Sequence, residues 1–260
     1  MLQRMQDRGD NITIRLNIQT QNLTEVTSRN TVAEVQGSEQ PEKVVIVSGH
    51  LDSWDVGVGA MDDGGGVFIS WYALVVLRTL GLKPKRTVRA VLWTNEENGM
   101  AGVKSYNEVH QDDLDDFIFI MESDYGTFTP LGLEFVAGAK GTCILTEIMK
   151  LLEPINATQA VKSTSVGSDI ALWTGIIPTG SLLNDNDAYF WYHHTKADTM
   201  DVMDTDALDK ATALWASVAY ILADLKDDFP GDFSDSDSGF YSVPNVLFII
   251  LLSLVGFVLR

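Results

Sequence analysis

Apolar residues form short, nearly continuous runs at four places along the chain. The runs cover residues 43–48, 87–93, 117–121 and 176–183. A strand that is covered by helices on both faces needs apolar side chains on both faces, so it shows no alternation between apolar and polar positions. We therefore predict four buried strands at the centre of a mostly parallel sheet.

Helical patterns separate these runs. Residues 67–80, 100–110, 141–152 and 206–225 predict helices, and Ser168-Asp169 predicts the start of a short helix that ends at Trp173. Strands that alternate with helices are typical of an α/β fold. The predicted fold class is a single α/β domain with a mixed, mostly parallel central sheet flanked by helices.

Three more segments predict strands outside the central four. Ile12, Ile14, Leu16 and Ile18 alternate with polar residues, which is typical of a half-buried strand. Residues 31–35 predict another strand, and residues 133–137 predict a strand at an edge of the sheet. Because the sequence opens on an edge strand without a start signal, we expect that an amino-terminal part of the domain is missing.

The 260 residues are predicted to divide into a folded domain over 1–228, an acidic polar spacer over 229–245 and an apolar tail over 246–260. The apolar run of the tail is shorter than the roughly 20 residues that a helix needs to cross a bilayer. Small residues at 234–236, a polar spacer and an apolar end are typical of a GPI-attachment signal. We expect membrane attachment through this tail by a GPI lipid, with a short tail anchor as the alternative.

The charge of the chain excludes one class of partner. Lys and Arg number 18 against 36 acids, which gives a formal net charge of −18. A nucleic-acid-binding surface needs clustered basic residues, so we expect no nucleic-acid partner.

Asn11, Asn22 and Asn156 each begin an Asn-x-Thr triplet, which permits N-glycosylation. These triplets favour the secretory pathway and a location outside the cell, in the lysosome or on the cell surface.

Histidines and acids gather where the predicted strands end. They are His50, Asp62, Glu97, Asp124 and His194, with Asp52 two residues after His50 and Glu96 directly before Glu97. The carboxyl ends of parallel strands share one edge of the sheet, and α/β folds bind their ligands there. Adjacent acids repel each other and need a compensating positive charge, which a metal supplies. Two histidines and three carboxylates suit two zinc-like ions, with one carboxylate bridging both.

Three neighbouring residues have other expected roles. Two such ions activate a water and polarise a carbonyl oxygen, and hydrolysis then needs a base. Glu96 is the expected general base, which takes a proton from the attacking water and passes it to the leaving amine. Asp52 is expected to hold the second ring nitrogen of His50 with its carboxylate. His193 is open to two interpretations, because its side chain could bind the oxyanion of the reaction or simply pack beside His194.

Five segments together resemble one known family. Gly49-His-Leu-Asp-Ser-Trp-Asp-Val-Gly57, Ala60-Met-Asp-Asp-Gly-Gly-Gly66, Trp93-Thr-Asn-Glu-Glu-Asn-Gly99, Met121-Glu-Ser-Asp124 and Tyr192-His-His-Thr-Lys-Ala-Asp-Thr199 resemble the motifs of the M28 zinc peptidases. The five motifs occur in the family's order, and the similarity runs from about Gly9 to Lys226. The resemblance implies a zinc-exopeptidase domain that binds two Zn²⁺ per chain.

The resemblance also implies a role for each motif residue. His50 and Asp124 would hold one zinc, Glu97 and His194 the other, and Asp62 would bridge both. Glu96 would be the general base and Asp52 the partner of His50, and a cis peptide bond would follow Asp62. Family members of this group carry a longer amino-terminal half with a small cap domain, which this sequence lacks, and they form homodimers. Their substrates are small peptides, here expected to be dipeptides with free termini.

Two other functions stay open. A relative that has kept the fold and lost the chemistry would be a receptor or interaction ectodomain, although the complete set of expected ligands favours catalysis. An aminopeptidase that acts on longer peptides would share the same zinc chemistry. An assay with zinc, a chelator and peptides of two or more residues discriminates among the three.

Overall fold

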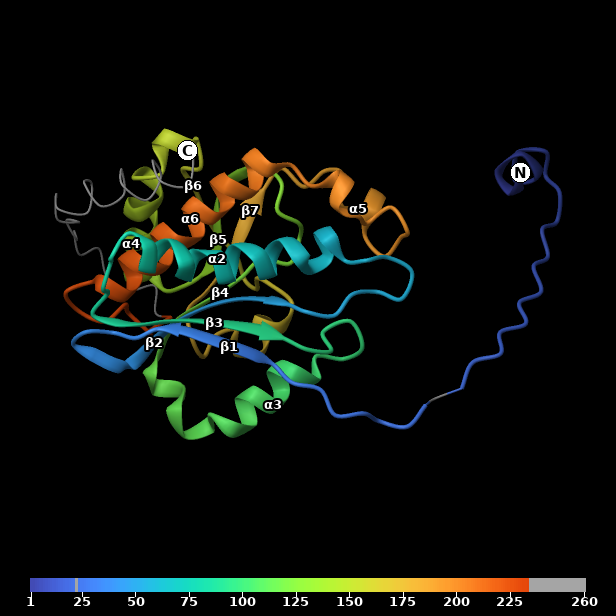
Figure 1. The fold of residues 1–260 in the computed structure, drawn as a ribbon. Coiled ribbons are helices and arrows are strands. Elements are labelled where there is room, and N and C mark those ends of the chain that lie inside the picture. Colours follow the sequence, from blue (N-terminus) through green and yellow to red (C-terminus); the bar gives the residue numbers. More distant parts are fainter. Residues whose placement is uncertain (22, 234–260) are drawn as a thin grey trace.

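A computed structural model describes residues 1–21 and 23–233 of the chain. Within these residues, seven strands form one sheet in the order β1-β3-β2-β4-β7-β5-β6 (Figure 1). The strands are β1 (Thr31–Val35), β2 (Gln40–His50), β3 (Arg86–Trp93), β4 (Phe117–Glu122), β5 (Pro130–Val136), β6 (Gln159–Lys162) and β7 (Thr179–Asn184). The four predicted central strands are therefore adjacent to one another, as β3, β2, β4 and β7.

The sheet is mixed and mostly parallel. The pairs β2–β3, β2–β4, β4–β7 and β5–β6 are parallel, whereas β1–β3 and β5–β7 are antiparallel. This arrangement confirms the predicted fold class. It also brings the carboxyl ends of β3, β2, β4 and β7 to the same edge of the sheet.

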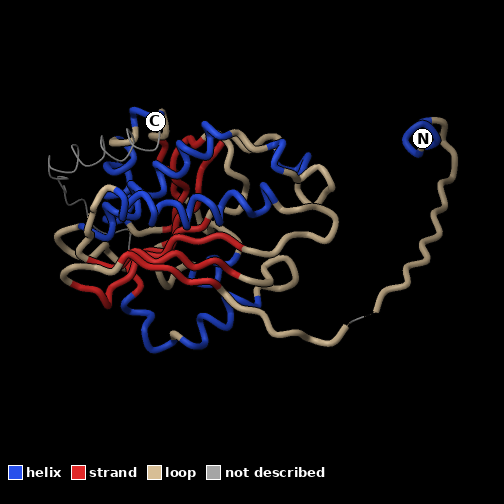
Figure 2. Tube along the Cα trace, viewed as in Figure 1, coloured by secondary structure: helices blue, strands red, loops and turns tan. Residues whose placement is uncertain are grey.

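Helices cover both faces of the sheet. The α-helices of the described residues are α1 (Leu2–Asp7), which lies away from the sheet in Figure 1, α2 (Gly65–Thr79), α3 (Ala101–Val109), α4 (Ala139–Lys150), α5 (Tyr189–Tyr192) and α6 (Thr205–Asp224). Figures 1 and 2 show α2, α4 and α6 on one side of the strands and α3 on the other. Shorter turns of 3₁₀ helix are η2 (Gln111–Asp116), η3 (Glu153–Ile155), η4 (Asp169–Trp173) and η5 (Met200–Val202), and a π turn, η1 (Ala60–Gly64), precedes α2.

Each face of the sheet has its own apolar core. Val45 and Val47 of β2 pack in the core under α2 and α6, whereas Val44 and Ile46 pack in the core on the α3 side. Burying a Val or Ile side chain stabilises the fold by about 1.5–3 kcal/mol. This two-sided burial is the physical reason why β2 shows a continuous apolar run instead of an alternating one.

A buried chain of hydrogen bonds joins α6 and α2 to β2. The indole Nε1 of Trp215 donates to the hydroxyl of Ser70 at 3.0 Å, and Ser70 donates to the main-chain oxygen of Ser48 at 2.9 Å. Ser48 lies two residues before His50. The chain therefore fixes both helices to the strand end that carries a predicted ligand.

The strand predicted over Ile12, Ile14, Leu16 and Ile18 is wrong. The segment between α1 and β1 is extended loop, all four side chains are exposed, and Figure 2 shows it reaching away from the sheet. A strand needs a neighbour to pair its N–H and C=O groups. Alternation marks a face that a sheet could bury, but no strand in the described residues pairs with this segment.

The position predicted for residues 133–137 is also wrong. These residues form β5, but β5 lies between β7 and β6, and the edge strand is the short β6. The sequence analysis missed β6 because its four residues, Gln-Ala-Val-Lys, are mostly exposed and carry little apolar signal. An edge strand has a neighbour on one side only, so more of its side chains stay exposed and a pattern that relies on burial does not detect it.

The division into domain, spacer and tail stays a prediction. Residues 234–260, which include the predicted GPI signal or tail anchor, lie outside the described residues, as does Asn22. The first residues of the predicted spacer pack on the domain, because Phe229 is buried edge-on against Phe119. Of the other glycosylation candidates, Asn11 and Asn156 are exposed. In the described part of the chain, one helix, Ala60–Thr79, is long and apolar enough to cross a membrane, and most of it is buried in the core.

Candidate metal centre

The register of the sheet places the predicted site residues together. His50 at the end of β2 is paired with Trp93 at the end of β3, and Ser48 is paired with Glu122 at the end of β4. Loops that leave these strands therefore start side by side. The loop after β7 returns through α5, which Figure 1 places at the same end of the sheet. Four chain segments that are distant in sequence meet at this edge.

The first cluster contains His50, Asp62 and Asp124, all three of them buried. Nε2 of His50 lies 3.1 Å from Oδ1 of Asp62 and 3.0 Å from Oδ1 of Asp124. Burial alone would lower the pKa of His50, but the hydrogen bonds to Asp124 and Asp62 outweigh it and raise the pKa. A cation at this point, whether a proton or a metal ion, is therefore strongly favoured.

The second cluster uses the other oxygen of Asp62. Nε2 of His194 lies 2.7 Å from Oε2 of Glu97 and 3.4 Å from Oδ2 of Asp62. Nε2 of His193 lies 3.3 Å from the same Asp62 oxygen, so His193 is as close to this carboxylate as its neighbour is. Asp62 thus presents one carboxylate oxygen to each cluster, which is the arrangement that a bridging ligand requires.

The donor set is compatible with zinc. Ligand atoms at 2.0–2.2 Å from a tetrahedral zinc lie about 3.3 Å from one another. The distances from His50 to its two acids and from His194 to Asp62 are within a few tenths of an ångström of that value. Oδ2 of Asp62 and Oε1 of Glu97 are buried without a hydrogen-bond partner, which is costly unless a cation binds there. Burial and the charge of Asp62 also raise the pKa of Glu97.

Two further carboxylates hold the main chain of the site. Asp63 accepts from the N–H groups of His50 and Gly66, at 2.9 and 3.0 Å. Asp198 accepts from the N–H groups of Met61 and Asp62, at 2.7 and 3.2 Å. These two residues were not predicted as parts of the site, because nothing in the sequence separates a carboxylate that binds N–H groups from one that binds a metal.

Asp52 acts through different atoms from those predicted. Nδ1 of His50 lies 2.9 Å from the main-chain oxygen of Asp52 and 3.9 Å from its nearer carboxylate oxygen. The carboxylate of Asp52 instead accepts from the N–H groups of Glu96 and Glu97, at 3.0 and 3.2 Å. Asp52 therefore orients His50 with its backbone and holds the Glu96–Glu97 turn with its side chain.

The backbone around the site adopts uncommon conformations. Asn95, directly before Glu96, has a φ of 61°, and His194 has a φ of 57°. Positive φ values of this kind occur in few non-glycine residues. The peptide bond between Asp62 and Asp63 is cis, as the family resemblance implies. Gly66 has no room for a side chain, because a Cβ there would meet the main-chain oxygen of Ser123 and the carboxylate of Asp63.

Two buried acids below Glu96 were missed by the sequence analysis. Glu122 accepts from the N–H groups of Ser168 and Ile170, at 2.8 and 3.2 Å. Asp169 is 0% exposed and neither of its carboxylate oxygens has a hydrogen-bond partner. Burial and the charge of Glu96 raise the pKa of Asp169 to about 8. The pKa of Glu96 itself is raised by burial and by the charge of Asp124.

Aromatic rings surround the second cluster. The ring of His194 lies between those of Trp54 and His193. Tyr189 packs against His193 and donates its hydroxyl to the main-chain oxygen of Asp124 at 2.9 Å. Phe190 and Trp191, which follow Tyr189 on the same short helix, are largely exposed.

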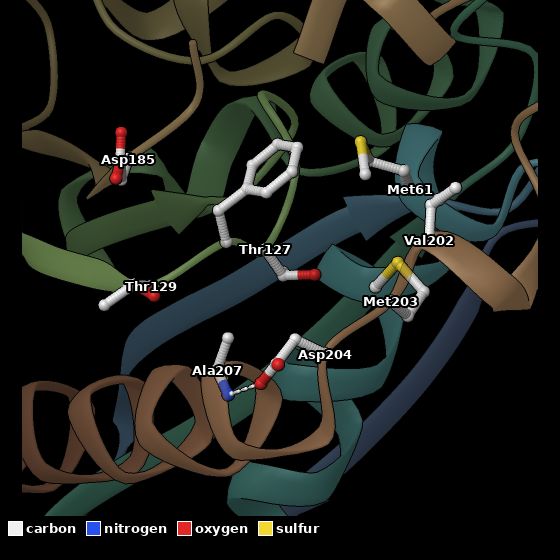
Figure 3. Close-up of a pocket in the computed structure, with 9 residues that line it drawn as sticks. Met61, Thr127, Thr129, Asp185, Val202, Met203, Asp204 and Ala207 are labelled. Carbon is white, nitrogen blue, oxygen red and sulfur yellow. Dashed lines mark hydrogen bonds between the residues drawn. The ribbon is translucent and has the colours of Figure 1, made fainter. Parts of the chain in front are cut away.

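A separate cavity lies behind Met61, the residue before Asp62. It has a volume of about 180 Å³ and is lined by Met61, Thr127, Asp185, Met203 and Asp204 among others (Figure 3). Asp204 points its carboxylate to the N–H of Ala207 at 2.8 Å, which caps the start of α6. None of the five predicted ligands lines this cavity, so it is distinct from the metal centre.

Comparison with known proteins agrees with this geometry. The model of peptidase family M28 matches residues 30–219, which is most of the chain. This chain belongs to peptidase family M28. It is 49% identical to carboxypeptidase Q of Bos taurus and to that of Homo sapiens, over 88% of this chain and 49% of each relative. The chain therefore spans about half the length of the curated relatives that it matches.

Solved structures of the family have the same fold. An M28 peptidase precursor from Shewanella amazonensis SB2B superposes with a TM-score of 0.72 at 35% identity, over 77% of this chain and 46% of the other. BSAP, a zinc aminopeptidase from Bacillus subtilis, superposes with a TM-score of 0.60 at 18% identity, over 79% of this chain and 53% of the other. The second likeness is one of fold alone.

Proposed function

We propose that this chain carries the catalytic centre of a dizinc exopeptidase that hydrolyses small peptides. The observation that carries the proposal is the position of Asp62, whose two carboxylate oxygens face two separate clusters of donors. His50 and Asp124 would hold one zinc, and Glu97 and His194 the other. Two bound zinc ions would lower the pKa of an attacking water and polarise the carbonyl of the scissile bond.

Glu96 is the proposed general base. Its carboxylate would take a proton from the attacking water and deliver it to the nitrogen of the leaving amine. Asp52 supports this role because its carboxylate binds the N–H groups of both Glu96 and Glu97, which keeps the base and the ligand in a fixed relation. Reacting groups need such positioning, since small displacements are costly in rate.

His193 is the proposed contact for the substrate oxygen that becomes negatively charged. Its Nε2 lies close to Asp62 and its ring is partly exposed beside His194. A donor placed where charge develops stabilises the transition state. The ring of His193 can stack on His194 and contact this oxygen at the same time. The two interpretations from the sequence, oxyanion binding and packing, are therefore compatible.

Dipeptides with free termini are the proposed substrates. Support comes from 49% identity to proteins named carboxypeptidase Q. The proposal is tested by assaying the purified chain with zinc on dipeptides and on peptides blocked or extended at either end. Hydrolysis of extended peptides from the amino end would instead favour the aminopeptidase function. A lack of any chelator-sensitive hydrolysis would favour a non-catalytic interaction domain.

The decisive experiment on mechanism is Glu96→Gln. This variant keeps the shape of the side chain but cannot accept the proton, so kcat is expected to fall by 10²-fold or more while two zinc ions stay bound. Glu108→Gln, on the exposed face of α3, is the matched control and should leave kcat unchanged. Near wild-type kcat in Glu96→Gln, with normal zinc content, would remove Glu96 from the role of base.

The location and assembly of the protein are also proposed. Exposed Asn11 and Asn156 support glycosylation in the secretory pathway, and the apolar tail supports GPI attachment at the outer cell surface. Release of peptidase from intact cells by phosphatidylinositol-specific phospholipase C would support the GPI attachment, and activity that stays cell-bound would contradict it. The proposed homodimer is tested by the mass of the purified chain in light scattering.

A further inference from the structure

The ring of His194 is held in a stack of three rings. The centroids of Trp54 and His194 are 4.3 Å apart and their planes differ by 8°. On the other face, the centroids of His193 and His194 are 3.6 Å apart and the planes differ by 18°. Trp54 comes from the loop after β2, so this contact joins two segments that are distant in the sequence.

Among the described residues, no partner gives His194 the hydrogen bond that usually orients a histidine ligand. Such a histidine normally donates its second ring N–H to a carboxylate or a main-chain oxygen, which fixes the direction of the ring. His50 has this partner, because its Nδ1 lies 2.9 Å from the main-chain oxygen of Asp52. In the described part of the chain, no hydrogen bond reaches Nδ1 of His194, and its known polar contacts all involve Nε2.

His194 lies in the loop that follows helix α5. Helix α5 ends two residues earlier, at Tyr192, and His194 itself has a φ of 57° in the following loop. Nε2 is directed toward Glu97 and Asp62, so the ring must stay in one plane for that nitrogen to reach both acids. A flat partner on each face can restrict the ring to this plane.

We infer that Trp54 is the positioning residue for His194, and that it supplies by stacking the restraint that His50 obtains from a hydrogen bond. The inference rests on the proposed dizinc function. An imidazole that binds Zn²⁺ becomes electron-poor, and the face of an indole ring attracts positive charge, so the stack favours the metal-bound form. Trp54 therefore stabilises zinc at the His194 site and leaves the His50 site unaffected.

The experiment compares Trp54→Ala and Trp54→Phe with the wild-type chain in zinc titrations against a chromophoric chelator. Trp54→Ala is expected to weaken the binding of one zinc ion by about 10-fold or more, the scale seen when partners of a ligand are removed. Trp54→Phe should recover part of the loss, because a smaller ring can still stack. Unchanged affinity of both sites in Trp54→Ala, or an equal loss at both, would overturn the inference.

Trp71 provides the matched control. It is 48% exposed against 40% for Trp54, but it lies on α2 beside Phe68 and Tyr72, away from the predicted ligands. Trp71→Ala should bind two zinc ions with wild-type affinity. Thermal unfolding of the zinc-free variants shows whether a variant has lost its fold or only the position of the ring. Both tryptophans are at the surface, so neither replacement should lower the Tm appreciably.

A metal-free measurement separates this inference from the proposed function. In the zinc-free protein, the ring protons of His194 should carry an NMR ring-current shift from Trp54, and Trp54→Ala should remove it. If the wild-type chain binds fewer than two zinc ions while the shift is present, the dizinc proposal fails and the stack stands. If two zinc ions bind and the His194 resonances do not move in Trp54→Ala, the positioning role is refuted.

Discussion

The carboxylate of Asp198 holds the main chain of Asp62. Its Oδ2 accepts from the N–H of Asp62 at 3.2 Å, and its Oδ1 accepts from the N–H of Met61 at 2.7 Å. Asp198 lies four residues after His194, so the loop that supplies one ligand also fixes the residue that faces both clusters.

Replacing Asp198 should affect stability and zinc binding together. Asp198→Ala leaves two buried N–H groups without an acceptor, which costs about 1–3 kcal/mol for each unsatisfied group. Urea unfolding of the zinc-free chain measures this loss, and the zinc content should fall as the Asp62 loop relaxes. Asp201→Ala, an exposed acid in η5, is the control. If Asp198→Ala unfolds at the wild-type midpoint, its hydrogen bonds do not support the loop.

Asp62→Ala should lose both zinc ions, whereas Asp124→Ala should lose one. The difference follows because Asp62 presents an oxygen to each cluster, whereas the carboxylate of Asp124 belongs to the His50 cluster. Elemental analysis after dialysis gives the zinc content per chain, with Asp55→Ala on the exposed loop as the control. An Asp62→Ala chain that retains two zinc ions would exclude the bridge.

Asp169 should make the zinc-free protein less stable as the pH rises. Its pKa is raised to about 8 in the fold from an ordinary value of 3.8. Between these pH values the folded state binds a proton that the unfolded state has released, so the free energy of unfolding decreases with rising pH. Each pKa unit corresponds to about 1.4 kcal/mol, as an upper limit for this group.

Asp169→Asn tests this dependence because the amide has nearly the same shape and no charge. Variant and wild type should have similar stability near pH 4, and the variant should become the more stable one toward pH 8. Denaturant unfolding at several pH values measures the difference, with exposed Asp112→Asn as the control. A constant difference across the range would show that Asp169 is ionised throughout in the folded chain.

The central strands and the grouping of the candidate ligands could be predicted because their signals are strong and independent. The apolar run of β2 reflects burial on both faces, and His50 directly follows it. The five expected ligands do meet in two clusters around Asp62. Each of these ligands comes shortly after a predicted strand in the sequence, which places it at the end of that strand.

Other parts could not be predicted because they depend on contacts across the fold. The alternation at Ile12 to Ile18 indicates a strand only if a neighbour exists, and the sequence cannot supply that information. The backbone atoms that Asp52 and Asp198 contact depend on how loops from different strands meet. The roles of Asp169 and Trp54 could not be predicted. The sequence does not show whether a carboxylate is buried without a partner, or whether an indole ring is stacked on another ring.

The hydrogen-bond chain from Trp215 through Ser70 to Ser48 limits how this sequence can diverge. An apolar residue at 70 would leave the indole N–H of Trp215 without a partner, and the main-chain oxygen of Ser48 would keep only the N–H of Ser123. A phenylalanine at 215 would remove the donor and leave the Ser70 hydroxyl with only the bond that it donates. Either change alone is costly, so positions 70 and 215 constrain each other through evolution although they lie on different helices. A pair of substitutions that alters both is the less costly route to a wholly apolar contact.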